Sequence, residues 1–161
     1  VVFSSVLFGS MNRRHFYWLT PLLGLLLWQL DRPQTSNPAS HPEAALWFQH
    51  PAPPATLDLL RAACFDCHSN ETVWPWYAHI QPIAGFVEGH VRQGRQEVNF
   101  SEWTHLSTED RPHMAKTCAK LIHKQSMPLH SYTWLHPEAK LSEAERQKLF
   151  DYFHPISLPA P

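Results

Sequence analysis

Two cysteines and a histidine lie within one short stretch, CFDCH, which ends at His68. Cys64 and Cys67 are separated by two residues, which is about one helical turn, so both thiols can reach the same ring. In c-type haem attachment each thiol adds to one vinyl group of the porphyrin, and the histidine that follows binds the iron. The CxxCH spacing therefore predicts a covalent haem, one per chain, with His68 as one axial ligand.

A CxxC pair also occurs in thiol–disulfide redox proteins and in zinc sites. The redox pair usually follows a strand of a βαβ unit, and a zinc site needs two more ligands at regular spacing. Neither context is visible in the sequence. The thiol–disulfide redox pair and the zinc site nevertheless remain open as alternatives to haem.

The second axial ligand has to come from a later segment, and methionine is the leading residue type. Met127 lies in QSMPL, directly before Pro128, so a loop can present its thioether to the iron. A nearby histidine, His130 or His136, is the next candidate, and an open site comes last. Met114, by contrast, is expected on the apolar face of a helix and therefore in the core.

Several other side chains could surround the haem. Arg95, Trp74, Trp76 and Tyr77 could donate hydrogen bonds to haem propionates or pack on the macrocycle. The alternative is that they are ordinary core aromatics and a surface arginine. Cys118 has apolar neighbours on its helical face, so we expect a buried reduced thiol there rather than a third thioether.

Helical patterns dominate the chain from residue 56 to 154. Thr56 is expected to cap a helix that places both sulfurs on one face, within a stripe formed by Leu57, Leu60, Cys64 and Cys67. Loop and turn are expected over 70–82, because Pro75 and Pro82 interrupt the periodicity.

Three further helices follow. One is expected over 83–93 and should end at Gly94, and another over 109–124. The last should begin after Ser142, with Glu145 completing a capping box. No alternating apolar run of strand length appears, so the domain is predicted to be all-α.

The N-terminal segment, residues 1–32, has the pattern of a targeting signal. Arg13 and Arg14 precede the almost wholly apolar run 16–30. That run is short of the about 20 residues that cross a bilayer. No small-x-small cleavage site follows Leu30, so we favour an uncleaved membrane anchor helix over a cleaved signal. Either one sends the rest of the chain out of the cytoplasm.

The stretch 33–55 is rich in proline and is expected to be an extended linker, within which Leu46, Trp47 and Phe48 could dock on the domain. The predicted haem-binding domain then covers 56–154, and a tail covers 155–161.

Composition excludes several classes of function. The formal net charge is -1, so no basic excess points to nucleic acid. No GxGxxG or GxxxxGK[ST] string occurs, which disfavours nucleotide chemistry. The 12 histidines and seven tryptophans suit a protein that binds a large flat cofactor.

A series of blocks resembles the bacterial haem-binding-domain family, in the order CFDCHSNETVWPWY, IQPIAGFVEGHV, GRQEVNFSEW, MPLHSYTWLHPEA and LSEAERQKL. Members are short exported or membrane-anchored proteins related to c-type cytochromes, and the likeness covers about residues 55 to 153. It implies a small cytochrome c-like helical domain, with Cys64 and Cys67 as attachment sites and His68 as the proximal ligand. Met127 falls in the family's MP block. Phe86 and His90 depart from the family's usual Trp and Asp.

Three functions compete at this point. The first is electron transfer in the bacterial periplasm, through a His/Met-ligated haem, with a redox partner protein near the membrane. The second is a haem enzyme or sensor with an open distal site for peroxide or a gas. The third is a thiol or zinc module without haem.

Overall fold

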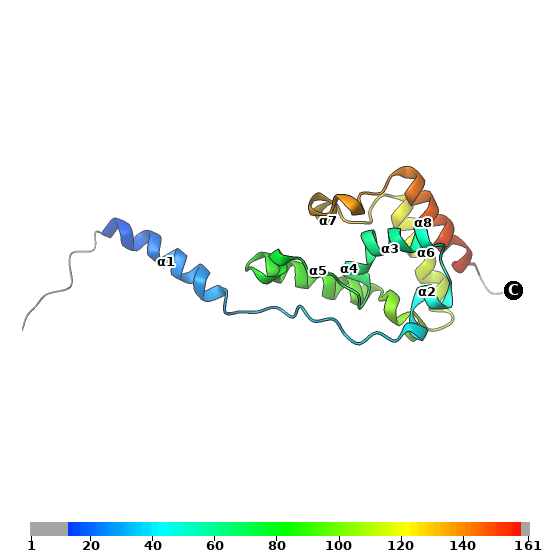
Figure 1. Cartoon of the computed structure of the whole chain (residues 1–161), viewed down its shortest axis with the longest axis horizontal. Coiled ribbons are helices and arrows are strands. Elements are labelled where there is room, and N and C mark those ends of the chain that lie inside the picture. Colours follow the sequence, from blue (N-terminus) through cyan, green and yellow to red (C-terminus); the bar gives the residue numbers. More distant parts are fainter. Residues whose placement is uncertain (1–12, 159–161) are drawn as a thin grey trace, which may run out of the picture.

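The structure of the chain is a computed structural model that describes residues 13–158. Residues 1–12 of the predicted targeting segment and 159–161 of the predicted tail lie outside the described residues. Within 13–158 every regular element is helical and there is no strand, which confirms the predicted all-α class (Figure 1).

The helices vary in length. The α-helices are α1 (Arg13–Trp28), α2 (Leu46–Gln49), α3 (Pro54–Leu60), α4 (Asp66–His68), α5 (Ile83–Glu97), α6 (Asp110–His123), α7 (His130–Leu135) and α8 (Glu143–Ile156). Short 3-10 turns are η1 (Pro42–Ala44), η3 (Trp76–His79), η4 (Phe100–His105) and η5 (Pro137–Ala139), and η2 (Arg61–Phe65) is a π-helical turn.

The core forms where α6 and α8 pack against each other and α3 packs on α8. Its largest fully buried side chains are aromatic and aliphatic: Trp103, Phe65, Phe153, Leu46, Leu60 and Leu149. Because these residues come from α2, η2, η4 and α8 as well as α3, one core joins both ends of the domain sequence. Burial of such side chains supplies the main stabilising free energy of the domain.

The predicted capping box at the start of α8 is confirmed. The hydroxyl of Ser142 accepts a hydrogen bond from the backbone N–H of Glu145, and the Glu145 carboxylate accepts one from the backbone N–H of Ser142 at 2.8 Å. The predicted helix over 109–124 is also confirmed, as α6. Local signals were sufficient for both elements.

Two predicted helix boundaries were wrong. The helix expected to follow a Thr56 cap begins at Pro54, because proline is well suited to a first helical position, and Thr56 is buried in the first turn. The helix expected to end at Gly94 continues to Glu97. The last helix ends at Ile156.

The proline-rich linker is only partly extended. Residues 42–49 form the turns η1 and α2, and Leu46 is fully buried. The ring of Trp47 packs on Phe65 with centroids 4.6 Å apart, whereas Phe48 is exposed. The expected docking is therefore confirmed for Leu46 and Trp47 but not for Phe48, and this end of the linker belongs to the domain.

The N-terminal helix α1 is shorter than expected for an anchor. Its 16 residues correspond to about 24 Å, against a hydrocarbon thickness of about 30 Å. Among residues 13–158, no helix combines the length and the apolar character that crossing a bilayer requires. The predicted membrane-spanning anchor is therefore not supported by the described part of the chain.

Candidate functional site

The two cysteines and the histidine of CFDCH lie at the end of a continuous helical segment made of α3, η2 and α4. Cys64 belongs to the π-helical turn η2, and Cys67 and His68 belong to α4. Single π-helical turns inside helices are frequent at functional sites. All three side chains are half-buried, so each is shielded from bulk water without being sealed in the core.

Both sulfurs are free thiols. Burial raises the pKa of Cys64 to about 12, with smaller contributions from Cys118 and Cys67. Burial and the neighbouring Asp66 raise the pKa of Cys67 to about 11. A thiol–disulfide redox centre needs a lowered thiol pKa, because the thiolate is the nucleophile. The environment of these two cysteines therefore does not favour the dithiol alternative.

The imidazole of His68 is held by two backbone carbonyls. Its Nδ1 lies 2.9 Å from the oxygen of Gly94 and 3.2 Å from that of Val98, both from the end of α5. Burial lowers the pKa of His68, while the two backbone hydrogen bonds oppose that shift. With Nδ1–H donating to a carbonyl, the ring is neutral and Nε2 keeps its lone pair for a metal, as ligating histidines require.

Gly94 allows α5 to approach α4 this closely. A Cβ atom at position 94 would lie 2.5 Å from the carbonyl oxygen of Cys67, and real Cβ atoms do not come so near to backbone. Glycine at this position therefore serves the packing of α5 on the CFDCH segment. The helix continues past this glycine to Glu97, contrary to the sequence-based prediction.

A cavity of about 360 Å³, here called the His68 cavity, lies against the CFDCH segment. Cys64 and His68 line it together with Met127 and with residues of α5, α6 and α8. The structure thus brings three of the predicted haem-binding residues to one cavity, although Met127 is about sixty residues away in sequence. Its wall is otherwise largely apolar, with Phe100, Leu121, Ile122 and Phe153 among its members.

Arg146 holds the backbone that carries Met127. Its guanidinium, extending from α8, donates to the carbonyl oxygen of Met127 at 3.0 Å and to that of Ile122 at 3.4 Å. The backbone N–H of Met127 also donates to the carbonyl of Leu121 at 3.3 Å. These bonds fix the loop after α6 and so determine where the thioether can reach.

Two further sulfurs line the same cavity. Met114 packs against the core, as predicted, but it also borders the His68 cavity. Cys118 is a free, half-buried thiol, and burial raises its pKa to about 12, which agrees with the predicted reduced thiol. Both lie on the face of α6 that the helical periodicity identified. Sequence reasoning found that face but assigned it to the core alone.

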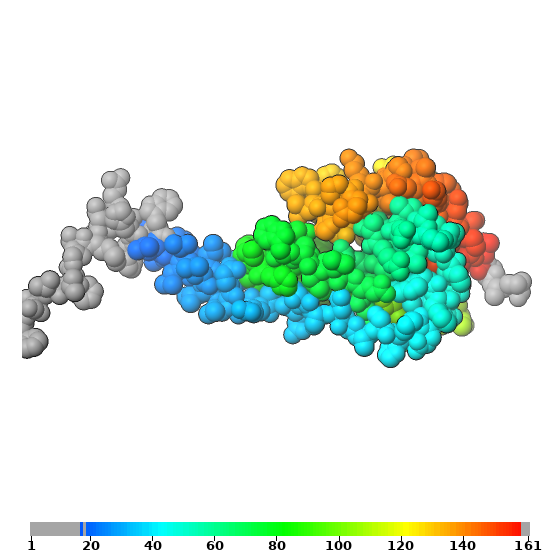
Figure 2. All heavy atoms as spheres, in the orientation of Figure 1, coloured from blue at the N-terminus to red at the C-terminus, as the bar shows by residue number. Residues whose placement is uncertain are grey.

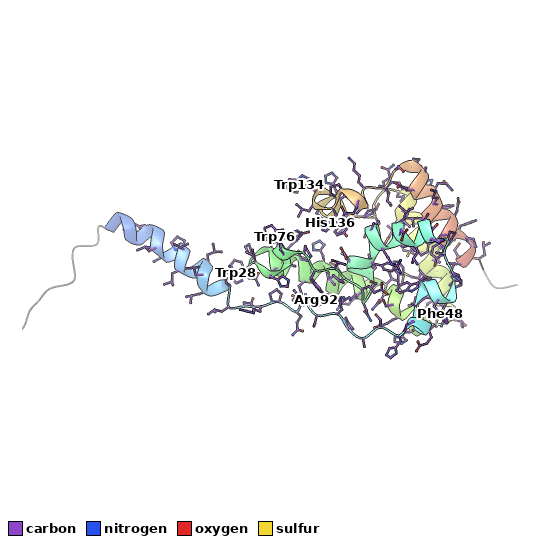
Figure 3. All side chains as sticks on the ribbon, viewed as in Figure 1. Trp28, Phe48, Trp76, Arg92, Trp134 and His136 are labelled. Carbon is purple, nitrogen blue, oxygen red and sulfur yellow. The ribbon has the colours of Figure 1, made fainter. Side chains whose placement is uncertain are left out.

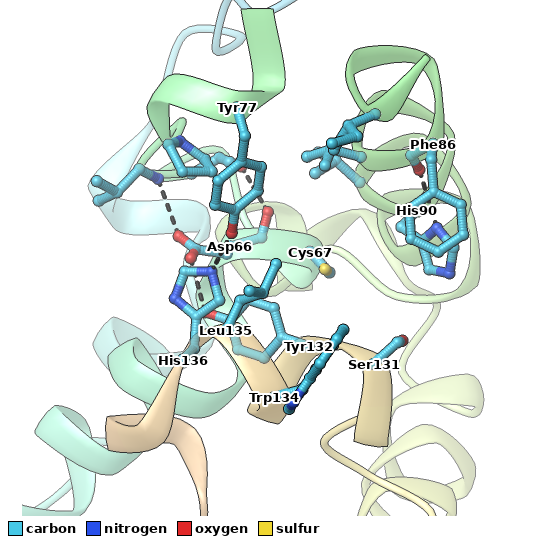
Figure 4. A pocket seen from close by; sticks show the side chains of 16 residues that line it. Asp66, Cys67, Tyr77, Phe86, His90, Ser131, Tyr132, Trp134, Leu135 and His136 are labelled. Carbon is cyan, nitrogen blue, oxygen red and sulfur yellow. Dashed lines mark hydrogen bonds between the residues drawn. The ribbon is translucent and has the colours of Figure 1, made fainter. Parts of the chain in front are cut away.

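A second cavity of about 370 Å³, here called the Cys67 cavity, is lined by Cys67 and by residues of η3, α5 and α7 (Figure 4). The Tyr132 hydroxyl donates to the Asp66 carboxylate at 2.7 Å, and burial together with this bond raises the pKa of Tyr132. The Tyr77 hydroxyl lies 2.7 Å from Nε2 of His136. The rings of Tyr132 and His136 stack 4.2 Å apart.

The two positions that depart from the resembled family are neighbours in this second cavity. Phe86 and His90 both line it, with ring centroids 4.2 Å apart. His90 Nδ1 also lies 2.9 Å from the backbone oxygen of Phe86. These two positions therefore both lie on the Cys67 side of the site.

The other predicted contact residues lie in different places. Tyr77 lines the Cys67 cavity, and Trp76 is exposed. Arg95 and Trp74 line neither cavity. Arg95 instead donates to Ser69 O and to Asn37 Oδ1, and Trp74 Nε1 also donates to Asn37 Oδ1. In the described structure these two side chains hold the linker on the domain.

The zinc alternative finds no ligand set in the described residues. No group of three or more histidine, cysteine, aspartate or glutamate side chains in that part of the chain is arranged to hold a metal ion. A single histidine whose Nδ1 faces two carbonyl acceptors, close to sulfur side chains, suits an iron that takes its remaining ligands from a porphyrin.

The sequence model of the haem-binding domain family matches residues 23–155, which is most of the chain. The chain therefore belongs to this family, as the order of the sequence blocks predicted, and it is a haem-binding protein. No curated protein and no solved structure matches it.

The residues present fit a haem. Free thiols at Cys64 and Cys67 each border one of the two cavities, so a group joined to both would contact the walls of both. His68 offers Nε2, because its other ring nitrogen is already bonded to backbone. A haem has a flat apolar ring and a charged propionate edge, so its site requires apolar walls with few polar groups.

Proposed function

We propose that this protein transfers single electrons through one c-type haem, joined covalently to Cys64 and Cys67 and ligated axially by His68 and Met127. The observation that supports this is the meeting of Cys64, His68 and Met127 at one largely apolar cavity. When bound, the haem would supply a reversible one-electron change at its iron.

The residues around this site would set its properties. The carbonyls of Gly94 and Val98 orient the His68 ring and make Nε2 more basic, because they accept the Nδ1 proton. A thioether ligand and an apolar wall both favour the reduced iron, and so raise the reduction potential. No acid–base side chain is needed for this function.

We propose that the protein works in the bacterial periplasm with a redox partner protein near the membrane. Thiols are joined to haem outside the cytoplasmic membrane, and the arginine-flanked apolar segment at the N-terminus is the pattern of an export signal. The electron carrier would then meet its partners in the compartment where it is assembled.

The first experiment tests covalent attachment. Full-length chain from cells able to mature c-type cytochromes should be coloured, and acid–acetone should leave the pigment on the protein. Cys64→Ala and Cys67→Ala should each reduce the covalent pigment, whereas Cys118→Ala, the matched third thiol, should retain it. A colourless wild type, or pigment that acid–acetone extracts, would overturn the proposal.

The second experiment tests the axial pair by spectroscopy. Oxidised wild type should show the weak sulfur-to-iron charge-transfer band, and Met127→Ala should lose it while keeping the haem. Met114→Ala serves as the matched control, since both thioethers line the His68 cavity. If only Met114→Ala loses the band, then Met114 of α6, and not Met127, is the iron ligand. Absence of the band in wild type, with rapid binding of carbon monoxide, would favour an open site instead.

A further inference from the structure

Three side chains form a hydrogen-bonded row that leads from the Cys67 cavity to the surface. The Tyr77 hydroxyl lies 2.7 Å from Nε2 of His136, and Nδ1 of His136 lies 3.0 Å from the Glu138 carboxylate. Tyr77 and His136 line the cavity, whereas Glu138 does not. Figure 4 shows the phenol and the imidazole pointing toward each other. The side chain of His136 is 17% exposed and that of Glu138 59%, so the row ends in water.

The fold brings this row together from distant parts of the chain. Tyr77 belongs to η3, whereas His136, 59 residues later, lies between α7 and η5, and Glu138 lies in η5. Figure 3 places His136 between α7 and the segment that carries Trp76 of η3. In the space-filling view the surface is hollowed between α7 and the start of α5 (Figure 2). The row therefore stands in the wall of the Cys67 cavity, which the macrocycle would contact.

The hydrogen bonds define where the protons of this row are. A carboxylate only accepts, so Nδ1 of His136 carries a proton, and in the neutral ring Nε2 accepts from the Tyr77 hydroxyl. A hydrogen bond to its own backbone and the one from His136 lower the pKa of Glu138, so its carboxyl group is ionised. Burial raises the pKa of Tyr77, so the phenol keeps its proton. A proton added at Nε2 would reverse the bond to Tyr77 without breaking it, because the phenol oxygen can also accept.

The charges around His136 favour a positive ring. Besides the Cys67 cavity, His136 lines an adjoining cavity of about 420 Å³. Among the described residues, the ionisable side chains that share these two cavities with it are Asp58 (α3), Arg61 (η2), Asp66 and Cys67 (α4), Tyr77 (η3), His90 (α5), Tyr132 (α7) and Glu138 (η5). Arg61 lies 3.8 Å from Asp58, which offsets its charge. Asp66 and Glu138 therefore leave an excess of negative charge, which stabilises an imidazolium at position 136.

We propose that His136 takes up one proton when the haem is reduced, so that this protein moves a proton together with each electron. Such coupling rests on the proposed electron transfer through the haem. The electron comes from the redox partner protein, and the proton comes from water beside the exposed Glu138. One O–H bond of a hydronium ion breaks, and one N–H bond forms at Nε2 of His136. Reoxidation returns the electron to an acceptor protein and the proton to water.

The added electron supplies the force that draws the proton. It brings one negative charge into a site with largely apolar walls, where charges attract more strongly than in water. Asp66 is held as a carboxylate by two donors, the Tyr132 hydroxyl at 2.7 Å and the Val73 N–H at 2.9 Å. Burial raises the pKa of Tyr132, so that phenol stays neutral. Of the groups around the two cavities, histidine is the type that changes charge close to neutral pH.

Two histidines line the Cys67 cavity, and their partners differ. Nδ1 of His136 contacts the Glu138 carboxylate, whereas Nδ1 of His90 lies 2.9 Å from the backbone oxygen of Phe86. A carboxylate in direct contact stabilises a protonated imidazole more than a neutral carbonyl does. The proton is therefore assigned to His136.

An equilibrium redox titration of the full-length haem protein, followed by absorbance between about pH 5.5 and 8.5, tests this coupling. The reduced protein binds more protons, so acid should favour reduction and the midpoint potential should fall as the pH rises. His136→Gln keeps a side chain that forms hydrogen bonds but cannot take up a proton, so its potential should lose this pH dependence. His130→Gln, which changes an exposed histidine of α7, is the matched control and should keep it.

Two results would overturn the coupling and leave the proposed electron transfer intact. One is a reversibly reduced haem whose potential does not depend on pH. The other is a pH dependence that persists in His136→Gln, because His90 or a haem propionate would then hold the proton, and His90→Gln separates these two. A protein without haem would instead remove the proposed function and the coupling together.

Variants of the two neighbours add an independent measurement. Tyr77→Phe removes the oxygen that would accept from the Nε2–H of His136, and Glu138→Gln removes the charge beside its Nδ1. Both make the imidazolium less stable, so the pH-dependent part of the potential should shift to lower pH. A pH range that is unchanged in both variants would contradict the coupling.

Nuclear magnetic resonance of the His136 ring reads its charge directly. At the pH where the wild-type potential changes most steeply, the ring should be an imidazolium in the reduced protein and neutral in the oxidised protein. A purely structural role of His136 would leave the ring in the same state in both, and that result would also overturn the coupling.

Discussion

The backbone oxygen of Gly94 lies 2.9 Å from Nδ1 of His68, in the same turn of α5 where the chain approaches Cys67 most closely. One residue without a side chain therefore serves two purposes. It allows α5 to pack on the CFDCH segment, and it presents the carbonyl that orients the predicted iron ligand. The ligand geometry thus depends on helix packing as well as on the motif.

Replacement of Gly94 by alanine should destabilise the protein. The new Cβ would lie 2.5 Å from the Cys67 carbonyl oxygen, so α5 or α4 must shift, at a cost of about 1–3 kcal/mol. Urea unfolding measures the loss, and haem content after maturation measures the displaced His68. Gly89→Ala is the matched control in the same helix, because nothing lies within 4 Å of its Cβ position.

The control should change stability in the opposite direction. Alanine is a better helix former than glycine by about 0.5–1 kcal/mol in a helix interior, so Gly89→Ala should be more stable than wild type. Equal effects of the two substitutions would mean that α5 does not pack on Cys67 as described.

Removal of the Arg146 guanidinium should loosen the loop that carries Met127. Arg146→Met keeps the length of the side chain but loses the donors to the Met127 and Ile122 carbonyls, which should cost about 1.5–3 kcal/mol in unfolding free energy. If Met127 is the axial ligand, the sulfur-to-iron band of the oxidised protein should also weaken. Lys148→Met, an exposed change on the same helix, should alter neither quantity.

Ser142 should contribute measurably to the stability of α8. Its hydroxyl satisfies the backbone N–H of Glu145, so Ser142→Ala leaves that donor without its cap and should cost about 1 kcal/mol. Thermal unfolding compares it with Ser142→Thr, which keeps a hydroxyl and should be close to wild type. A neutral Ser142→Ala would show that α8 is held by its core face alone.

Much of this structure could be predicted from short-range patterns. The capping box of Ser142 and Glu145, the helix α6 and the CxxCH spacing each depend on residues within a few positions of one another. Met127 was predicted from its place in QSMPL before Pro128, and it lines the His68 cavity together with Cys64 and His68. These features depend on neighbouring residues or on one face of a helix, so short motifs and helical periodicity predict them.

The remaining features depend on contacts between distant segments. Gly94 has the signature of a helix end, and only its approach to Cys67 reveals a packing role. Arg95 was expected near haem propionates, but Asn37, 58 residues earlier, accepts its hydrogen bond. No local sequence pattern indicates these packing and hydrogen-bond partners, because only the fold brings the distant segments together.

Stability should fall on acidification partly through His50. Burial, with a smaller contribution from Arg111, lowers the pKa of His50 in the folded state. The unfolded chain therefore takes up this proton first, below about pH 6.5, so acid favours unfolding until the folded state is protonated as well. His50→Gln should make the loss of unfolding free energy between about pH 7 and pH 5 smaller than in wild type. Urea unfolding at the two pH values measures it, with exposed His113→Gln as the matched control. An identical pH dependence in wild type and His50→Gln would mean that the His50 ring is not desolvated in the folded protein.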